Sequence, residues 1–192
     1  MHSYRVNEIF YSLQGEGHWS GTPMVFVRLS GCNLRCPFCD TDHAAATPMS
    51  AAAILEGVRK AGGDCRRICL TGGEPSLQTD DALLELLHGA GYLLHIETNG
   101  THPLPEGIDW ITLSPKEDVK GLQGDGRVVL PRADELKLIF GEGDPARWES
   151  FPAKYRSLQP RSCSNTAETI AFVLAHPQWT LSLQTHKYLA IK

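Results

Sequence analysis

The chain has 192 residues, a formal net charge of −4 and a hydrophobic fraction of 42%, enough apolar residues for one sizeable core over residues 1–192. The acidic balance disfavours nucleic acid as a partner, because nucleic-acid-binding domains carry a basic surface. No stretch approaches the roughly 20 apolar residues of a membrane span, and six cysteines without a secretory signal predict a reducing, cytoplasmic setting.

Eight segments have the alternating or β-branched pattern of strands. In chain order they are 4–10, 24–30, 67–71, 92–97, 109–113, 135–140, 155–158 and 179–184. Three helices are predicted: 51–61 capped by Ser50, 80–90 capped by Thr79, and 166–176 capped by Asn165. Residues 117–132 form a polar, glycine-rich loop, and residues 185–192 form a tail.

Strands that alternate with helices predict βα units and a parallel sheet, hence an α/β fold. About six core strands and three helices are too few for a closed eight-fold barrel, so we expect a partial, open barrel. The polar motifs directly follow strands. Because ligands sit at the carboxyl ends of parallel strands, we expect these motifs to ring one mouth of the barrel.

Cys32, Cys36 and Cys39 form a C-x₃-C-x₂-C run directly after strand 24–30. Thiols this close along the chain cannot easily pair as disulfides, but they can converge on one metal centre. Three thiolates leave a fourth position open, as in a metal site that carries out chemistry. The alternatives are a zinc site completed by His43 and a loop of reduced cysteines.

Gly72, Gly73, Glu74 and Pro75 end the strand over 67–71. Two glycines let the backbone come close to a ligand and offer it free N–H and C=O groups. A plain turn is the alternative, because Gly-Gly and Glu-Pro are turn dipeptides. The position of this motif, one helical crossover after the cysteine run, favours a ligand site.

Gln14 and Glu16 lie in a glycine-flanked loop. An amide and a carboxylate can bind the edge of a guanine-like or pterin ring, because the carboxylate accepts from a ring N–H and an exocyclic amine. A solvated turn is the alternative. Arg28 lies within an apolar strand and needs a partner, either a ligand carboxylate or a protein acid such as Glu97.

The motifs LQGEG, SGCNLRCPFCDTD, TGGEPSLQ, HIETNGT, DWITLSPK, DELKLIF, SLQP and LSLQTHKYLAIK follow in this order along nearly the whole chain. Together they resemble the 7-carboxy-7-deazaguanine synthase family of the radical S-adenosylmethionine (SAM) superfamily. The cysteine run and the GGE motif are general to the superfamily, whereas LQGEG, CDT and LQTHKYL are specific to the family.

The resemblance implies a reduced, partial radical SAM barrel with about six core parallel strands, three main helices and extra N-terminal and loop elements. It implies a homodimeric lyase that contracts the ring of 6-carboxy-5,6,7,8-tetrahydropterin to give 7-carboxy-7-deazaguanine, with loss of ammonia, for queuosine and other deazapurines. The implied cofactors are a [4Fe–4S] cluster, SAM and Mg²⁺. A flavodoxin or ferredoxin would donate the electron.

The resemblance also implies roles for individual residues. Cys32, Cys36 and Cys39 would hold the cluster, and Thr41 would bind magnesium. The residues implied for SAM are Phe38, Gly73, Glu74, Ser114, Pro115, Lys116, Gln159, Pro160, Arg161 and Ser162. Those implied for the substrate are Leu13, Gln14, Gly15, Glu16, Arg28, Thr71, Glu97, His186 and Lys192, the last through its terminal carboxylate. Without the resemblance, a Ser-Pro or Asp-Thr pair indicates a turn, and a lone His indicates surface.

Two other functions fit part of the pattern. A radical SAM activase that makes a glycyl radical on a partner protein shares the cysteines and the GGE motif, but it has no reason to keep LQGEG or LQTHKYL. A zinc-binding interaction module would need only the cysteine run, and analysis for zinc and sulfide separates it from an iron–sulfur protein.

Overall fold

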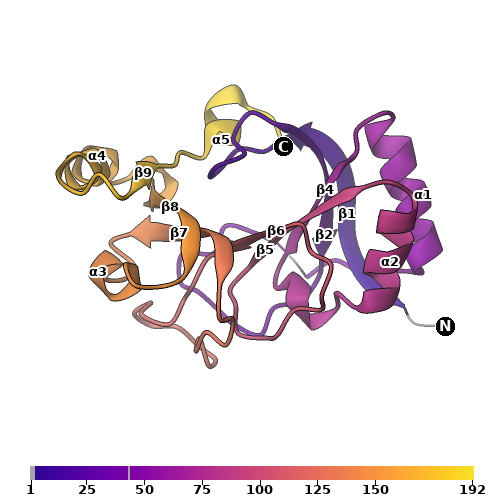
Figure 1. The fold of residues 1–192 in the computed structure, drawn as a ribbon, viewed down its shortest axis with the longest axis horizontal. Coiled ribbons are helices and arrows are strands. Elements are labelled where there is room, and N and C mark those ends of the chain that lie inside the picture. Colours follow the sequence, from indigo (N-terminus) through magenta and orange to yellow (C-terminus); the bar gives the residue numbers. More distant parts are fainter. Residues whose placement is uncertain (1–2, 43) are drawn as a thin grey trace.

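A curved sheet organises the computed structural model, which describes residues 3–42 and 44–192 (Figure 1). Its strand order is β3-β1-β2-β4-β5-β6-β7-β8-β9. β1 (Tyr4–Leu13) pairs antiparallel with β2 (Pro23–Leu29) and β3 (Thr47–Met49). From β2 onward all pairs are parallel. The remaining strands are β4 (Arg67–Gly72), β5 (Leu93–Thr98), β6 (Trp110–Leu113), β7 (Ala133–Phe140), β8 (Ala153–Pro160) and β9 (Thr180–Leu181).

The predicted partial barrel is confirmed, with β2, β4, β5, β6, β7 and β8 as its six main parallel strands. α1 (Ala51–Gly62) and α2 (Asp81–Gly89) lie outside the sheet beside β1 and β4, and α4 (Thr166–Ala175) lies near β8 (Figure 1). The short helices α3 (Pro145–Trp148) and α5 (Thr185–Leu189) complete the α-helices of the described residues. Within those residues no helix combines the length and the apolar character needed to cross a membrane. The unbroken sheet supports our inference of a single domain.

The helix caps differ in part from those predicted. Ser50 caps α1 as expected, accepting from the amide of Ala53 at 3.2 Å. Thr79 does not cap α2, because its hydroxyl donates to a backbone carbonyl in the preceding turn, and Asp80 accepts from the amide of Leu83 instead. Asn165 stands at the cap position of α4, but its side chain bonds neighbouring loops and makes no cap.

Two expectations for the C-terminal residues were wrong, and two short elements were not predicted. The tail over 185–192 contains α5, and the strand predicted over 179–184 pairs only at Thr180 and Leu181. β3 and α3 were not predicted, because three or four residues carry too little periodicity to identify an element. These elements are short and lie at the edges of the fold, so the central sheet is unaffected.

The two faces of the strands differ in polarity. Leu136 and Leu158 belong to a buried cluster that includes Trp148 of α3, and the strands nearer the N-terminus form a second cluster with α1 and α2. The alternate residues Glu135 and Lys137 are also buried, and they bond polar groups from other strands and from residues 14–22 inside the barrel. Period-two alternation therefore places apolar side chains outward and polar side chains inward.

The connection between β1 and β2, residues 14–22, runs along the inner face of the open barrel. Gln14 donates to Glu97 at the end of β5 at 3.3 Å, and the amide of His18 donates to Glu135 at 2.9 Å. Trp19 packs edge-on against the rings of His95 and Trp110. This connection therefore fills part of the interior of the open barrel.

Candidate active site

One cavity of about 300 Å³ opens at the carboxyl ends of the parallel strands. All site residues predicted from the sequence line it, except Pro115, which lies in a smaller neighbouring hollow. His43, the candidate zinc ligand, lies outside the described residues. The lining also includes residues that were not predicted: Phe10, Phe26, Leu34, Asp40, Gly72, Thr98, Asn99, Lys137, Ile139 and Gln184.

The cysteine loop follows β2 and brings three free thiols to this cavity. The loop is shaped by bonds from the amide of Leu34 to the sulfur of Cys32, at 3.4 Å, and from the amide of Cys39 to the carbonyl of Cys36, at 3.1 Å. Burial raises the pKa of the Cys32 and Cys36 thiols, and the nearby charge of Lys116 opposes this rise. Thiolate ligands at this position therefore need a cationic centre to hold their charge.

The chemistry of the three thiols fits an iron–sulfur cluster, because the irons of such clusters are held by cysteine thiolates. Within residues 3–42 and 44–192 no group of three His, Cys, Asp or Glu side chains is placed to hold a single metal ion. The open, thiol-lined end of the cavity therefore fits a cluster held by Cys32, Cys36 and Cys39.

The GGE motif packs directly against the cysteine loop. The sequence predicted free amides here, but the amides of Gly73 and Glu74 are both bonded. The amide of Gly73 donates to the carbonyl of Leu29 at 3.0 Å, and the amide of Glu74 donates to that of Gly31 at 2.8 Å. A Cβ on Gly73 would lie 2.1 Å from the carbonyl oxygen of Gly31. Glycine is therefore required here because two backbone segments touch, and only the carbonyl side is left for a ligand.

Glu74 is buried, with 1% of its surface exposed, and it joins the ends of two strands. Its Oε1 accepts from the hydroxyl of Thr98 at 2.6 Å and the amide of Ser76 at 3.0 Å, and its Oε2 accepts from the amide of Asn99 at 2.7 Å. These three bonds show that the carboxylate holds the ends of β4 and β5 together, in addition to any contact with a ligand.

The loop with Gln14 and Glu16 is held by the C-terminal segment. Thr185 donates to the carbonyl of Gly15 through its amide, at 2.8 Å, and through its hydroxyl, at 2.9 Å. A Cβ on Gly15 would lie 2.1 Å from Nδ1 of His186, so the contact requires glycine. The structure thus places LQGEG and LQTHKYL side by side, although they lie at opposite ends of the chain.

Arg28 has a different protein partner from the one considered. Its Nε bonds Oε1 of Glu8 at 3.1 Å, and Glu97 is not its partner. The reason is register: Glu8 lies directly opposite Arg28 in the antiparallel pair of β1 and β2, where side chains share a face. Its terminal nitrogens have no hydrogen-bond partner among the described residues, and the side chain lines the cavity.

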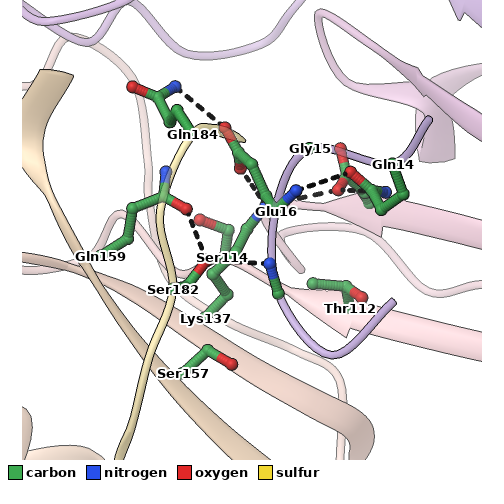
Figure 2. A network of polar contacts seen from close by, with 12 residues as sticks. Gln14, Gly15, Glu16, Thr112, Ser114, Lys137, Ser157, Gln159, Ser182 and Gln184 are labelled. Carbon is green, nitrogen blue, oxygen red and sulfur yellow. Dashed lines mark hydrogen bonds and ion pairs between the residues drawn. The ribbon is translucent and has the colours of Figure 1, made fainter. Parts of the chain in front are cut away.

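On the side of the cavity formed by β6 and β8, the polar residues bond one another. Lys116 donates to the carbonyl and the hydroxyl of Ser114, both at 2.6 Å, and burial lowers its pKa. Gln159 accepts from the hydroxyl of Ser182 at 2.9 Å (Figure 2). Ser162 adopts φ 43°, a left-handed conformation uncommon for a residue with a Cβ.

Comparisons with known proteins agree with this geometry. Residues 26–117 match the family described as the radical SAM superfamily. A 7-carboxy-7-deazaguanine synthase from Bacteroides thetaiotaomicron is 52% identical over 188 residues, which cover 98% of each chain. A second, from Bradyrhizobium diazoefficiens, is 41% identical and covers 99% of this chain and 100% of the relative. The chain belongs to the 7-carboxy-7-deazaguanine synthase family.

The crystal structure of QueE from Escherichia coli shares this fold, with a TM-score of 0.81, 30% identity and coverage of 96% of this chain and 95% of that one. The predicted radical SAM fold is therefore confirmed. As a member of the 7-carboxy-7-deazaguanine synthase family, the chain is a radical SAM enzyme of the lyase type. The superfamily implies an iron–sulfur cluster and SAM as cofactors.

Lys137 and Gln184 are the main functional candidates that sequence reasoning missed. Lys137 forms ion pairs with Glu16 and Glu97, and Gln184 donates to Glu16 at 2.9 Å (Figure 2). A signal for Lys137 was present, because a lysine that alternates with leucines in a buried strand faces the interior. Gln184 lies in the family-specific LQTHKYL motif, but only His186 of that motif was assigned a role.

Proposed function

We propose that this chain converts 6-carboxy-5,6,7,8-tetrahydropterin into 7-carboxy-7-deazaguanine, with ring contraction and loss of ammonia. The name shared by its full-length relatives supports this proposal. The observation that carries it is one cavity lined both by the cysteine loop and by the family-specific LQGEG and LQTHKYL segments. A superfamily member of another activity, such as a glycyl-radical activase, has no use for the second set of residues.

A [4Fe–4S] cluster would be held by Cys32, Cys36 and Cys39. When bound, the cluster and SAM supply the one-electron chemistry that takes a hydrogen atom from the substrate. The residues that would contact SAM are Phe38, Gly73, Glu74, Ser114, Pro115, Lys116, Gln159, Pro160, Arg161 and Ser162. Because Pro115 lies outside the main cavity, its contribution would be to fix the turn between Ser114 and Lys116.

The substrate would lie on the opposite side of the cavity, between the LQGEG loop, β4, β5 and α5. Leu13, Gln14, Gly15, Glu16, Thr71, Glu97 and His186 would contact its ring. Arg28 presents two terminal guanidinium nitrogens there, and this planar fork suits a carboxylate. These residues would bind and orient the pterin and exclude water from it.

Thr41 would provide a hydroxyl ligand for Mg²⁺, an ion that takes few protein ligands and fills its shell with substrate oxygens and water. Lys192 lines the same part of the cavity, and Ser12 donates to its main-chain oxygen at 2.6 Å. We propose that the main-chain end of this residue supports the substrate, while its ammonium pairs with Glu8.

The remaining expectations complete the proposal. A low-potential protein such as a flavodoxin or ferredoxin would donate the electron, the enzyme would be a homodimer, and the product would enter queuosine synthesis. Cytoplasmic function is supported by the free thiols of Cys32, Cys36, Cys39, Cys65 and Cys69, which suit a reducing compartment.

The test is product formation under anaerobic conditions. The protein is reconstituted with iron and sulfide and mixed with SAM, a reductant, Mg²⁺ and 6-carboxytetrahydropterin, and the products are followed by mass spectrometry. We expect a deazaguanine carboxylate without matched consumption of SAM. If only 5′-deoxyadenosine appeared, a radical SAM enzyme with a different substrate would be indicated.

A further inference from the structure

The interior of the barrel contains one lysine between two carboxylates. Lys137 projects inward from β7, with 8% of its side chain exposed. Its Nζ pairs closely with Oε2 of Glu16, from the loop after β1, and lies 3.3 Å from Oε1 of Glu97, at the end of β5. Figure 2 shows Lys137 and Glu16 meeting beneath Gln184. Three segments distant in sequence are thus joined at one ammonium.

The two carboxylates have further donors that fix their planes. Oε1 of Glu97 also accepts from Gln14 at 3.3 Å, and its Oε2 accepts from the hydroxyl of Thr71 at 3.2 Å. Oε1 of Glu16 accepts from Gln184 at 2.9 Å. A carboxylate has about four acceptor positions, so both groups keep capacity for donors from a ligand. Both also line the cavity.

The charges in this group depend on one another. Burial acts to raise the pKa of Glu16, but the charge and hydrogen bond of Lys137 outweigh it and hold this pKa at about 2. Burial acts to lower the pKa of Lys137, and the two carboxylates raise it above its usual range instead. Lys137 and Glu16 are therefore both ionised at neutral pH, and the ammonium lies between the carboxylates of Glu16 and Glu97.

Several other ionisable side chains in the described part of the chain surround the Lys137 ammonium. The other ionisable side chains that face its ammonium are Glu135 on β7, Cys69 on β4 and Lys116 after β6. Lys116 is already bonded twice to Ser114. Those that face Glu16 from other segments are His186 of α5, Asp40, which pairs with Lys187, and again Lys116 and Cys69.

We propose that Lys137 is a positioning residue for substrate recognition, which holds the carboxylates of Glu16 and Glu97 in the orientation needed to accept from adjacent N–H and amino groups of the pterin ring. This inference rests on the proposed function. The two carboxylates would then discriminate between ligands. A ring that presents a hydrogen-bond acceptor at either position would face a fixed carboxylate oxygen, which is also an acceptor, and would bind poorly. Sites built on fixed hydrogen bonds discriminate strongly against ligands that leave them unpaired.

The experiment compares Lys137→Met with the wild type as reconstituted holoenzymes. The dissociation constant of 6-carboxytetrahydropterin is measured anaerobically in the presence of SAM from pH 6 to pH 8. We expect binding to Lys137→Met to be at least about tenfold weaker at pH 7 and to weaken further as the pH falls, because the Glu16 carboxylate takes up a proton once the neighbouring ammonium is gone. Wild-type binding should change little over this range. Iron content and SAM affinity should match the wild type.

Two further variants separate positioning from simple damage to the fold. Lys154→Met removes an exposed lysine on β8 that pairs with Asp134, and it should bind the pterin as the wild type does. Glu97→Gln is measured alone and combined with Lys137→Met. Because the groups act as a unit, the combined loss should be smaller than the product of the two separate losses. Lys137→Gln replaces the methionine variant if that protein does not fold.

The proposal would be overturned if Lys137→Met bound the pterin with wild-type affinity and a flat pH profile, or if the losses in the double variant were independent. In either case, turnover by the wild type would leave the proposed function standing. Failure of the wild type to bind or convert the pterin would instead remove the proposed function, and this inference with it.

Discussion

Glu74 allows a quantitative prediction, because its carboxylate is buried and accepts three hydrogen bonds from the ends of β4 and β5. Glu74→Ala would strand one hydroxyl and two backbone amides. At about 1–3 kcal/mol for each stranded donor, the total is roughly 3–9 kcal/mol. Water that enters the vacated space brings this toward about 3 kcal/mol. That is still a large part of the roughly 5–15 kcal/mol that stabilises a domain.

The assay is urea unfolding of the cluster-free protein in the presence of a thiol reductant and without SAM. Glu85→Ala, an exposed change on α2, is the control and should shift stability by less than about 0.5 kcal/mol. Glu74→Gln keeps one acceptor oxygen and should fall between the alanine variant and the wild type. A Glu74→Ala protein as stable as the wild type, but with weakened SAM binding, would show that the carboxylate acts on the cofactor alone.

Three further changes test other parts of the structure. Gly73→Ala would drive a Cβ into a backbone carbonyl and should lower iron content after reconstitution, whereas Gly89→Ala, which meets nothing within 4 Å, should not. Arg28→Ala should weaken pterin binding at least about tenfold with the cluster and SAM binding intact. Glu8→Gln, which breaks the ion pairs of Glu8 with both Arg28 and Lys192, should bind normally; equal losses in the two variants would assign the effect to these pairs. Burial lowers the pKa of His95 to about 4, so unfolding takes up a proton between about pH 6.5 and 4. Stability should fall over this interval by up to about 1.4 kcal/mol per pH unit, and His95→Phe should flatten that part of the urea-unfolding profile.

The fold was predictable because long strands show their period in the sequence. Residues 135–138 alternate charged with apolar side chains, and this alternation matches the inner and outer faces of the barrel. The antiparallel pairing of β1 with β2 was not predicted, although their nine-residue connection is shorter than the dozen or more residues that a parallel crossover needs. The short helix α5 was missed because five residues give no helical repeat.

The site was predictable where a residue type was unusual for its position. Three cysteines in eight residues, paired glycines at a strand end and an arginine in an apolar strand all stand out locally. The partners of these residues could not be identified from the sequence, because strand register and contacts between distant segments determine them. Glu8 faces Arg28 across two strands, and Lys137 meets Glu16 from 121 residues away.

The contact between Gly15 and Thr185, 170 residues apart, has a consequence for the order of biosynthesis. A ribosome releases the cysteine loop and the GGE motif long before it releases α5, at roughly 5–20 residues per second. The segments that would hold the cluster can thus pack together while the pterin side of the cavity still lacks its last wall. Closing that wall is a long-range event and is expected to be slow relative to the local packing. Substrate binding therefore requires the whole chain through α5, whereas iron binding requires only the earlier segments.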